Sequence, residues 1–392
     1  MIKIDKKENC CGCTACVAIC PKSCIEMKED LEGFLYPQVD EKKCVECGAC
    51  ERVCPLNDEH NIKNKVLSAC IVQNKNKEIL RQSTSGGAFT PIAEYVIDNG
   101  GVVFGVAMEI QDCFVKHIKV QKKEELGKFR SSKYVQSYVG DTFTDAKKEL
   151  NTGRLVCFSG TPCQIQGLKN YLHRSYDNLI TVDVVCRGVP SPGIWKKYIE
   201  YLKVKGKLSS VKFRDKTLGY QYSTMEIKYC NGRIDRNGIE SDQWLRMFFS
   251  GMTLRPSCSH CNFRVVERCS DFTIWDCFNV SDLTKDIDET KGATRMLIHS
   301  DKGLEIFNNI KDKYYVVNSS VDRIAMGISE NVYENEKKEQ FIKDFNQMGM
   351  DMLINKWFPV TVAIRFKKFL RRLLNIVGID LFVKKIKRKI KK

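Results

Sequence analysis

Eight cysteines within the first 54 residues follow one spacing twice, and this doublet constrains the fold more than any other feature of the chain. In each copy, three cysteines separated by two residues are followed, after three more residues, by a fourth cysteine and a proline. The first copy begins at Cys10 and ends at Pro21, and the second begins at Cys44 and ends at Pro55. Thiolates at this spacing wrap a four-iron, four-sulfur (4Fe–4S) cubane, and the fourth cysteine of each copy binds the other cluster.

This exchange of fourth ligands predicts two sets of four thiolates. One set contains Cys10, Cys13, Cys16 and Cys54, and the other contains Cys44, Cys47, Cys50 and Cys20. A tetrahedral zinc site is the alternative, but it uses four ligands and would not explain eight. We expect Gly12 and Gly48 to let backbone N–H groups approach sulfur, where they would tune the reduction potential. Cys11 and Cys24 lie off the pattern and are expected to be small buried hydrophobes.

The rest of the chain predicts a larger globular unit. Of the 392 residues, 43% are hydrophobic and 29% are charged, which is an ordinary globular composition with room for two or three domains. Short β-branched stretches at 101–107, 154–159 and 179–185 predict strands, and segments 87–98 and 192–204 predict helices. Residues 300–356 are expected to be mostly helical.

The predicted fold class is therefore α+β in three parts. A small dicluster head (residues 1–60) precedes a mixed α/β body (residues 66–356), with a polar linker at 59–65 between them. A basic amphipathic tail (residues 357–392) follows the body.

Cysteine usage indicates the compartment. The chain has twenty cysteines but only five histidines, and its first nine residues are polar and charged, without the apolar region of a signal peptide. In a reducing compartment, clustered cysteines indicate metal or redox chemistry more often than disulfides. We therefore expect a cytoplasmic protein.

The formal charge of +16 is unevenly distributed. The head has eight Lys and Arg against twelve Asp and Glu, a net charge of −4, whereas residues 361–392 have twelve against one, a net charge of +11. Each oxidised cluster with its four thiolates adds −2, so that the loaded head would carry about −8. The molecule is predicted to be acidic at one end and strongly basic at the other.

Seven short motifs follow the head in a fixed order. They are Ser83-Thr84-Ser85-Gly86-Gly87-Ala88-Phe89, Arg130-Ser131-Ser132-Lys133-Tyr134-Val135-Gln136-Ser137, Gly160-Thr161-Pro162-Cys163-Gln164, Cys186-Arg187-Gly188-Val189-Pro190-Ser191-Pro192, Phe213-Arg214-Asp215-Lys216, Cys258-x2-Cys261 and Ser270-Asp271-Phe272-Thr273-Ile274. This set, behind a bacterial-ferredoxin-type head, resembles the coenzyme F420 hydrogenase/dehydrogenase beta-subunit family over roughly residues 1–300. The resemblance implies a flavoprotein that uses FAD to pass electrons between iron–sulfur clusters and a two-electron substrate, such as a deazaflavin coenzyme. Many bacterial members have no known substrate, and some members are subunits of larger enzymes.

The candidate flavin-binding residues lie in three of these motifs. Two adjacent glycines in the first motif would free backbone N–H groups for a phosphate at the start of a helix; its candidate residues are Ser83, Thr84, Ser85, Gly86 and Gly87. The alternative is a plain helix N-cap formed by Ser85. Arg130, Lys133 and Tyr134 offer charge and a stacking face, and a solvated basic strand is their alternative. Gly160 and Thr161, in the turn before Cys163, complete the candidate set.

Four further cysteines are expected to lie on turns or loops of the body. They are Cys163, Cys186, Cys258 and Cys261. Together they would supply the ligands of a third 4Fe–4S cluster. A zinc site from the same four residues and buried free thiols are the two alternatives.

One segment departs from the family pattern. The family usually continues Asp271-x-Thr-Ile with Gly-Asp-Phe/Tyr-Trp-Gly, whereas this chain has Trp275-Asp276-Cys277-Phe278-Asn279. Glycine at the first of these positions would allow a ligand to approach the backbone closely, and Trp275 would fill that space. The substrate pocket and the flavin are therefore both in question.

In the tail, apolar residues from Phe366 onward recur with a helical period, and Lys367, Lys368, Arg371 and Arg372 lie on the other side. An apolar face beside a cationic face suits the surface of an anionic membrane, and the segment after Gly378 adds more lysines. The alternatives are a solvated or protein-docking tail and a nucleic-acid contact. No nucleic-acid-binding signature accompanies the tail, so we expect no nucleic-acid partner.

Two functions are consistent with the sequence. The first is an iron–sulfur flavoprotein oxidoreductase that passes electrons between the head and a small organic two-electron substrate, with a redox partner protein at the head. The second is a non-catalytic electron-transfer subunit or adaptor, held by its tail at the inner face of the membrane. No side chain stands out as a catalytic acid or base.

Overall fold

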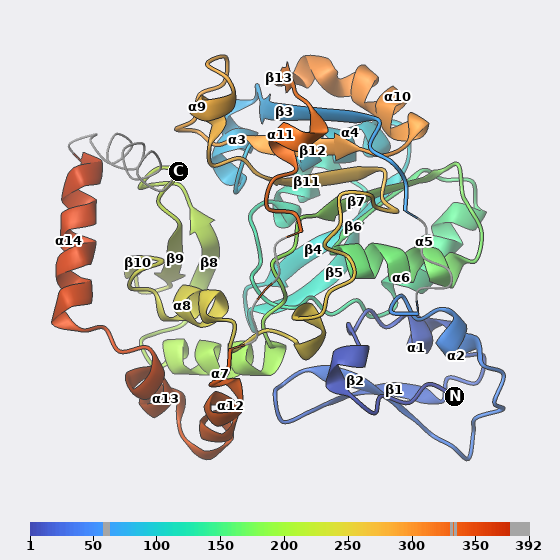
Figure 1. The fold of residues 1–392 in the computed structure, drawn as a ribbon, viewed down its shortest axis with the longest axis horizontal. Coiled ribbons are helices and arrows are strands. Elements are labelled where there is room, and N and C mark those ends of the chain that lie inside the picture. Colours follow the sequence, from blue (N-terminus) through green and yellow to red (C-terminus); the bar gives the residue numbers. More distant parts are fainter. Residues whose placement is uncertain (58–62, 330–331, 333–334, 377–392) are drawn as a thin grey trace.

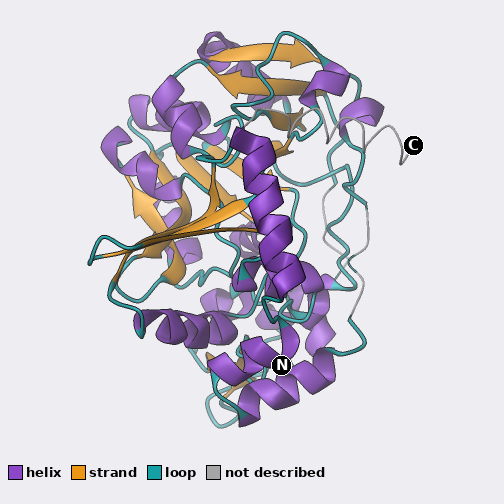
Figure 2. Ribbon diagram, turned by 90° about the vertical axis from the view of Figure 1, so that its left-hand side faces the viewer, coloured by secondary structure: helices purple, strands orange, loops and turns teal. Residues whose placement is uncertain are grey.

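The computed structural model describes residues 1–57, 63–329, 332 and 335–376. It contains an eight-stranded sheet, a three-stranded sheet and a two-stranded hairpin, with helices on both faces of the large sheet. The hairpin belongs to the head, which lies at the lower right of Figure 1, whereas the last helix lies at its far left and is nearest the viewer in Figure 2. This confirms the predicted α+β class with a small dicluster head, a mixed α/β body and an amphipathic C-terminal helix.

The head is built from two short helices and one hairpin. Strands β1 (Ile25–Glu29) and β2 (Leu35–Val39) pair in antiparallel fashion, and helices α1 (Ala15–Ile19) and α2 (Ala49–Arg52) follow the two cysteine loops. A 3-10 turn, η1 (Lys7–Asn9), leads into the first loop. So little apolar surface is buried among these elements that the head depends on its cofactors and on the body for a core.

The large sheet has the strand order β13-β3-β12-β11-β7-β6-β4-β5. Its strands are β3 (Ser68–Asn74), β4 (Val102–Glu109), β5 (Phe114–Val120), β6 (Val156–Gly160), β7 (Leu179–Val184), β11 (Phe272–Asp276), β12 (Thr294–Ile298) and β13 (Tyr314–Asn318). Strands β4, β6, β7 and β11 run parallel to one another. β12 pairs antiparallel with β11 and with β3, so β3 runs in the same direction as the four. Their carboxyl ends therefore meet at one edge of the sheet, where open α/β sheets bind ligands.

Helices cover both faces of this sheet. One face carries α4 (Phe89–Asp98), α10 (Asp301–Ile310) and the 3-10 segment η3 (Lys123–Phe129). The other carries α5 (Thr142–Asn151), α6 (Pro162–Leu172), α9 (Val280–Leu283) and α11 (Val321–Ile324). Near-continuous apolar strands such as β4 and β6 follow from this two-sided burial.

Local sequence explains where two important helices begin. Both α6 and α7 (Pro192–Lys203) have proline at their first position, where the missing N–H costs nothing. Thr161 and Gln164 form a reciprocal capping box at α6, and the Ser191 hydroxyl accepts from the N–H of Ile194 at α7. Cys163 lies in the first turn of α6, and Cys186 lies in the segment before α7.

A second core surrounds the three-stranded sheet. Strands β8 (Leu208–Asp215), β9 (Thr224–Tyr229) and β10 (Ile234–Gly238) form the sheet, and four helices pack with it: α7, α8 (Gln243–Ser250), α12 (Lys338–Gln347) and α13 (Met350–Trp357). Aromatic side chains fill this core, and Trp195 meets Trp244 with 4.6 Å between ring centroids. β8 then carries the chain back to the carboxyl edge of the large sheet.

The last helix, α14 (Val362–Ile376), confirms the helical period of the tail, but its basic face lies against the protein and its apolar face is the exposed one. Its basic side is docked on the protein: Lys368 donates to Asn237 (2.5 Å), Arg371 pairs with Glu240 (2.6 Å) and Arg372 donates to the carbonyl of Arg236 (2.7 Å). Its apolar side is exposed, and its most exposed large side chains are Val362, Phe366, Phe369, Leu370 and Leu373. The lysine-rich segment after Gly378 lies outside the described residues.

Most of the predicted elements are confirmed within one or two residues. The strands expected at 101–107, 154–159 and 179–185 are β4, β6 and β7, and the helix expected at 192–204 is α7. Within 300–356, residues 314–318 form strand β13 and extend the large sheet, which the helical expectation missed. No helix among the described residues is long and apolar enough to cross a membrane.

Candidate redox centres

The two cysteine loops of the head repeat in conformation as well as in spacing. Two residues in each loop have left-handed backbone, at the second and fourth positions after the first cysteine: Gly12 (φ 70°) and Thr14 (64°), then Glu46 (50°) and Gly48 (69°). Gly12 and Gly48, which the sequence singles out, are therefore not equivalent positions. Left-handed backbone costs a non-glycine residue roughly 1–2 kcal/mol, so Thr14 and Glu46 are held there by the loop as a whole.

The first predicted set of thiolates surrounds a hollow in the head. Cys10, Cys13, Cys16 and Cys54 all line one small pocket together with apolar residues such as Ile2 and Met27. Burial and the neighbouring thiolates of Cys10 and Cys54 raise the pKa of Cys16 to about 12. Four thiolates can lose their protons in such a hollow only beside a cationic group, and an iron–sulfur core supplies one.

The second predicted set lies closer to solvent. Cys20, Cys44 and Cys50 pack around Ile25, whereas Cys47 is exposed. Cys24, which lies off the ligand pattern, is buried as expected, and its Sγ lies 3.3 Å from that of Cys20. The two head sites thus differ in access to water: the first is enclosed and the second is open on one side.

A cubane and a single ion need different arrangements of these cysteines. In the part of the chain that the structure describes, no group of three or more His, Cys, Asp or Glu is arranged so that it could hold a metal ion. A single zinc ion would need all its thiolates about 2.3 Å from one point. A cubane binds each thiolate at a different iron corner, so the thiolates stand farther apart.

The four candidate cysteines of the body converge. Cys163 lies in the first turn of α6, Cys186 follows β7, and Cys258 and Cys261 lie at and after a 3-10 turn, η4 (Pro256–Cys258). Burial raises the pKa of Cys186, and the thiolates of Cys258, Cys163 and Cys261 all raise it further, so the four side chains lie within electrostatic reach of one another. The structure thus brings together the residues that the sequence predicts as a third site.

Cys11 lies between the head and this third site. Its hydrogen bond with Cys13 raises the pKa of its thiol well above the ordinary value, and its thiol also contacts that of Cys163. The prediction that Cys11 is buried is correct, but no sequence pattern indicates its contact with the body. The Cys11 thiol therefore contacts both Cys13 of the first head set and Cys163 of the body set.

The loop at residues 83–87 lies at the carboxyl edge of the sheet, beside the end of β3, but its polar groups are largely used within the protein. The N–H of Gly86 donates to Thr294 Oγ1 (2.8 Å), and the Ser85 hydroxyl shares a hydrogen bond with the same atom (2.8 Å). A Cβ on Gly86 would lie 2.4 Å from the Val72 carbonyl oxygen, so glycine is needed there for packing against the sheet. These contacts take up groups that a phosphate would otherwise use.

The helix after this loop starts later than the sequence suggests. α4 begins at Phe89, with Ala88 as its N-cap, so Gly87 does not open it. Gly87 has φ 72° and forms the turn before the helix, which only glycine adopts without strain. Ser85 therefore does not act as the N-cap either, because its hydroxyl is bonded to Thr294.

The other candidate flavin residues fall into two places. The Thr84 hydroxyl accepts from the N–H of Ser132 (2.7 Å), which places Arg130, Lys133 and Tyr134 beside the 83–87 loop. Burial lowers the pKa of Lys133 to about 7, and the Tyr134 ring stacks on Phe248 (4.7 Å).

Gly160 and Thr161 lie instead with the body cysteines. Thr161 caps α6, and its Oγ1 lies 3.2 Å from Cys163 Sγ. The candidate flavin set thus extends from the 83–87 loop along the carboxyl edge toward the third cysteine site, and it fits a flavin only in part.

A polar and aromatic cluster at this edge was not singled out as a site from the sequence. Arg214, at the end of β8, pairs with Asp276 (3.3 Å) and donates to the hydroxyl of Tyr134 (3.1 Å). Tyr220 donates to Asp276 (3.1 Å) and stacks on Phe278 (5.1 Å). Arg214 is buried, and its Nη2 has no hydrogen-bond partner among the described residues. The sequence signals were the Phe-Arg-Asp-Lys motif, Tyr134 of the candidate flavin set and the segment that follows Ile274.

The departure at Trp275 does not place its indole in this cluster. Trp275 packs with Ala69, Ile71 and Leu297 on the α11 side of the sheet, and Arg295 lies 5.8 Å from its ring. Asp276, the next residue along β11, faces Arg214 and Tyr220. The bulky residue therefore leaves the cluster around Asp276 in place.

Comparison with known proteins assigns both parts of the chain. Residues 153–323 match the family described as the C terminus of the beta subunit of coenzyme F420 hydrogenase/dehydrogenase, and residues 9–57 match the 4Fe–4S dicluster domain. Residues 153–323, less than half of the chain, are thus similar to this beta-subunit family. The assignment covers the third cysteine site and the Asp276 cluster in one domain and the doubled motif in the other.

Two curated relatives agree with this assignment. The chain is 23% identical over 328 residues to a coenzyme F420-dependent sulfite reductase of Methanocaldococcus jannaschii, which covers 80% of this chain and 48% of the relative. It is 42% identical over 52 residues to a ferredoxin 7Fe of Hydrogenibacillus schlegelii, covering 13% of this chain and 60% of that protein. The chain thus spans about half the length of the larger relative.

A solved structure with partial similarity is the F420-reducing nickel–iron hydrogenase complex from Methanosarcina barkeri, at a TM-score of 0.44 and 15% identity. The match covers 73% of this chain and 91% of that one. Together the two matches indicate similarity to iron–sulfur subunits of oxidoreductases.

Proposed function

We propose that this protein is an iron–sulfur flavoprotein oxidoreductase that passes electrons between its head and an organic two-electron substrate. The observation that carries the proposal is the contact of Cys11 with both Cys13 of the head and Cys163 of the body. The cysteine groups extend from the exposed Cys47, past the enclosed Cys10 set and Cys11, to Cys163 at the carboxyl edge of the sheet. The proposed cofactors are two 4Fe–4S clusters in the head, a third in the body and a flavin, FAD, beside it.

The flavin, when bound, would supply the exchange between single electrons and an electron pair transferred as hydride. The residues proposed to hold it are Ser83, Thr84, Ser85, Gly86, Gly87, Arg130, Lys133, Tyr134, Gly160 and Thr161. Arg214 adds a permanent positive charge whose free Nη2 suits an anionic part of the flavin or of the substrate. Asp276 and Tyr134 fix the guanidinium of Arg214 in place.

A second candidate function is supported by the 83–87 loop. Its N–H and hydroxyl groups are bonded to Thr294, and Phe248 covers one face of Tyr134. Such internal contacts in place of ligand contacts are what we expect of a protein that has lost its flavin. In that case the chain would be an electron-transfer subunit that connects a redox partner at the head to another enzyme.

The deciding experiment is anaerobic purification of the full chain, followed by denaturation and assay of released flavin, iron and sulfide. At four iron atoms per cubane, we expect about twelve iron and about one flavin per chain. About eight iron with full flavin would remove the third cluster but keep the oxidoreductase. No flavin after reconstitution with FAD or FMN would overturn the proposal in favour of the electron-transfer subunit.

We also propose that the exposed face of α14 contacts an anionic membrane surface, which would hold a cytoplasmic protein at the inner face of the membrane. Its apolar side chains are far more exposed than most, with Phe366 at 65% and Phe369 at 60%. Residues 377–392 add seven Lys and Arg against one Asp. Apolar side chains next to a polybasic segment are the combination that anionic lipid favours.

A further inference from the structure

One arginine of the body reaches into the head. Arg255 lies just before η4 (Pro256–Cys258), so it is part of the loop that carries Cys258 and Cys261, yet three of the four side-chain hydrogen bonds that it forms with described residues are with the head. Its Nε donates to the carbonyl of Cys10 (2.7 Å), and its Nη2 donates to Cys10 Sγ (3.4 Å) and to the carbonyl of Leu35 (2.9 Å). The side chain is only 1% exposed.

The guanidinium is held rigidly in this position. Its Nη1 donates to Gln136 Oε1 (3.0 Å), and Gln136 donates to the carbonyl of Cys11 (2.9 Å). Its plane lies 4.3 Å from the ring centroid of Tyr36. A Cβ on Gly12 would lie 2.8 Å from Arg255 Nη1, so the cysteine loop is shaped to admit this side chain.

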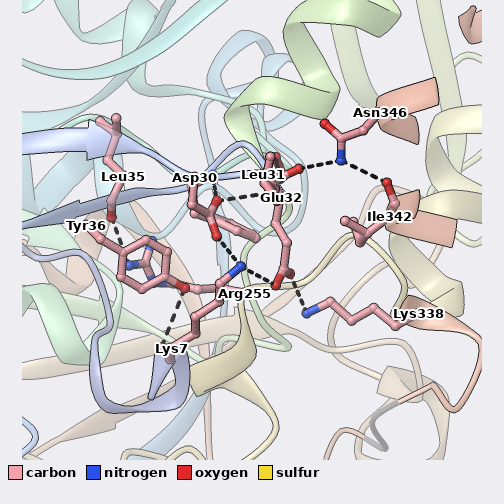
Figure 3. A network of polar contacts seen from close by, with 12 residues as sticks. Lys7, Asp30, Leu31, Glu32, Leu35, Tyr36, Arg255, Lys338, Ile342 and Asn346 are labelled. Carbon is pink, nitrogen blue, oxygen red and sulfur yellow. Dashed lines mark hydrogen bonds and ion pairs between the residues drawn. The ribbon is translucent and has the colours of Figure 1, made fainter. Parts of the chain in front are cut away.

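A second group of contacts ties the same part of the head to the body (Figure 3). Lys338 of α12 pairs with Glu32 (2.9 Å), and Asn346 donates to the carbonyl of Leu31 (2.9 Å). Lys7 pairs with Asp30 and with Glu32 within the head. The Arg255 contact therefore exists only when the head is docked on the body.

The position of this charge has a direct electrostatic consequence. A 4Fe–4S cluster gains one negative charge on reduction, and hydrogen bonds to its sulfur ligands stabilise the reduced state. Arginine stays protonated at all relevant pH values, so its charge is constant. Since the guanidinium is enclosed by the head and the body, little water screens it.

We propose that Arg255 is a positioning residue that makes the cluster bound by Cys10 easier to reduce, and that it does so only in the docked head. The proposal rests on the assignment of Cys10 to a cluster, but not on the flavin. In the step concerned, the cluster accepts one electron from an external reductant, no bond is broken and no proton moves. Docking would thereby favour the cluster nearest the body as electron acceptor over the outer one.

The test is a potentiometric titration of the anaerobically purified full chain with dithionite, followed by electron paramagnetic resonance of the reduced clusters. In Arg255→Gln, we expect the equilibrium constant for reduction of one head cluster to fall about tenfold, which is about 59 mV for one electron. The other head cluster should change far less. Arg255→Lys keeps a charge beside the sulfur and should restore part of the shift.

Two control variants separate tuning from loss of structure. Arg246→Gln removes another body arginine that donates to carbonyl groups, those of Phe358 and Pro359, and should shift neither cluster. Glu32→Gln weakens the contact with Lys338 without touching Cys10. An unchanged potential in Arg255→Gln would overturn the proposal, and so would an equal shift of both head clusters. If Arg255→Gln assembles no clusters, Arg255→Lys is measured instead: a smaller shift confined to one head cluster is expected, and an equal shift of both head clusters would overturn the proposal.

Discussion

At the residue scale, the cysteines divide into those that spacing can assign and those that only three-dimensional contact can. The eight head cysteines are assigned by spacing because three of each predicted set lie within seven residues and the whole motif is repeated. Cys163 and Cys186 come close to Cys258 only through the strands and turns that place them at one edge of the sheet. Cys258 lies 72 residues beyond Cys186 along the chain. Cys11 needed the docking of the whole head, and no local pattern carries that information.

Replacing one body cysteine tests the third site directly. In Cys163→Ser we expect bound iron to fall from about twelve to about eight per chain, because a cubane that loses one thiolate is not retained. Iron and sulfide assays on the anaerobic protein measure this. Cys230→Ser, at an exposed cysteine, is the matched control and should leave iron unchanged. If Cys163→Ser also leaves iron unchanged, these cysteines bind no cluster.

At the element scale, periodicity and capping signals predict most of the fold. Strands β4, β6 and β7 and helix α7 were found because apolar runs and a proline-initiated helix are local signals. The start of α4 was misplaced because Ser85 looks like an N-cap, whereas its hydroxyl bonds to Thr294, 209 residues away in sequence. The orientation of α14 was unpredictable for the same reason: Asn237 and Glu240 decide which side docks.

The N-cap of α8 predicts a pH dependence of stability. Asp242 accepts from the N–H of Leu245 (2.9 Å), and burial raises the pKa of its carboxyl to about 7, against about 3.9 in an unfolded chain. Between these values the folded state holds the proton more tightly, so the free energy of unfolding falls as the pH rises through this window. Asp242→Asn keeps the N-cap hydrogen bond and removes the pH-dependent loss of stability.

Chemical denaturation at pH 5 and pH 8 measures the effect. We expect Asp242→Asn to be more stable than the parent at pH 8 by more than about 1 kcal/mol, given about 1.4 kcal/mol for each pKa unit. The difference should be much smaller at pH 5. Asp301→Asn, in the first turn of α10, replaces an exposed carboxylate and should show no such pH-dependent difference. Equal effects of Asp242→Asn at both pH values would contradict a raised pKa.

Helix α14 yields a prediction about lipid binding. Replacing Phe366 and Phe369 by glutamate adds charge to the apolar face and should abolish co-sedimentation with vesicles rich in phosphatidylserine. The same change at Leu31, an exposed leucine of the head, should have no effect. Vesicle binding that survives the double substitution would mean that the apolar face of α14 does not contact lipid.

At the scale of the whole molecule, the head packs directly against the helices of the body. A Cβ on Gly167 of α6 would lie 3.0 Å from Cys13 Sγ, and one on Gly193 of α7 would lie 2.6 Å from the Cα of Gly33 in the head. Sequence analysis predicted both parts but not this contact, since each glycine lies in an ordinary helix. The electrical polarity was predictable from charge counts, and the fold places the head at the lower right of Figure 1 and α14 at its far left.

Gly167→Leu tests whether close docking is needed for electron flow. The larger side chain would collide with Cys13, which we expect to destabilise the protein by roughly 1–3 kcal/mol. It should also slow the passage of electrons from the head to the body, as followed by rapid-mixing absorbance. Gly127→Ala is the control, because its Cβ would meet only the Arg130 side chain at 3.9 Å. Unchanged transfer in Gly167→Leu would show that docking does not limit electron flow.

The unequal burial of the two head sites also bears on how the protein withstands oxygen. Cys47 is exposed, whereas Cys10, Cys13 and Cys16 are buried under apolar side chains. Oxygen and peroxide would therefore reach the outer cluster first and consume it while the inner one survives. Exposure to air would therefore separate the protein from its electron donor before the inner cluster is damaged. Rebuilding the outer cluster alone would then restore the protein.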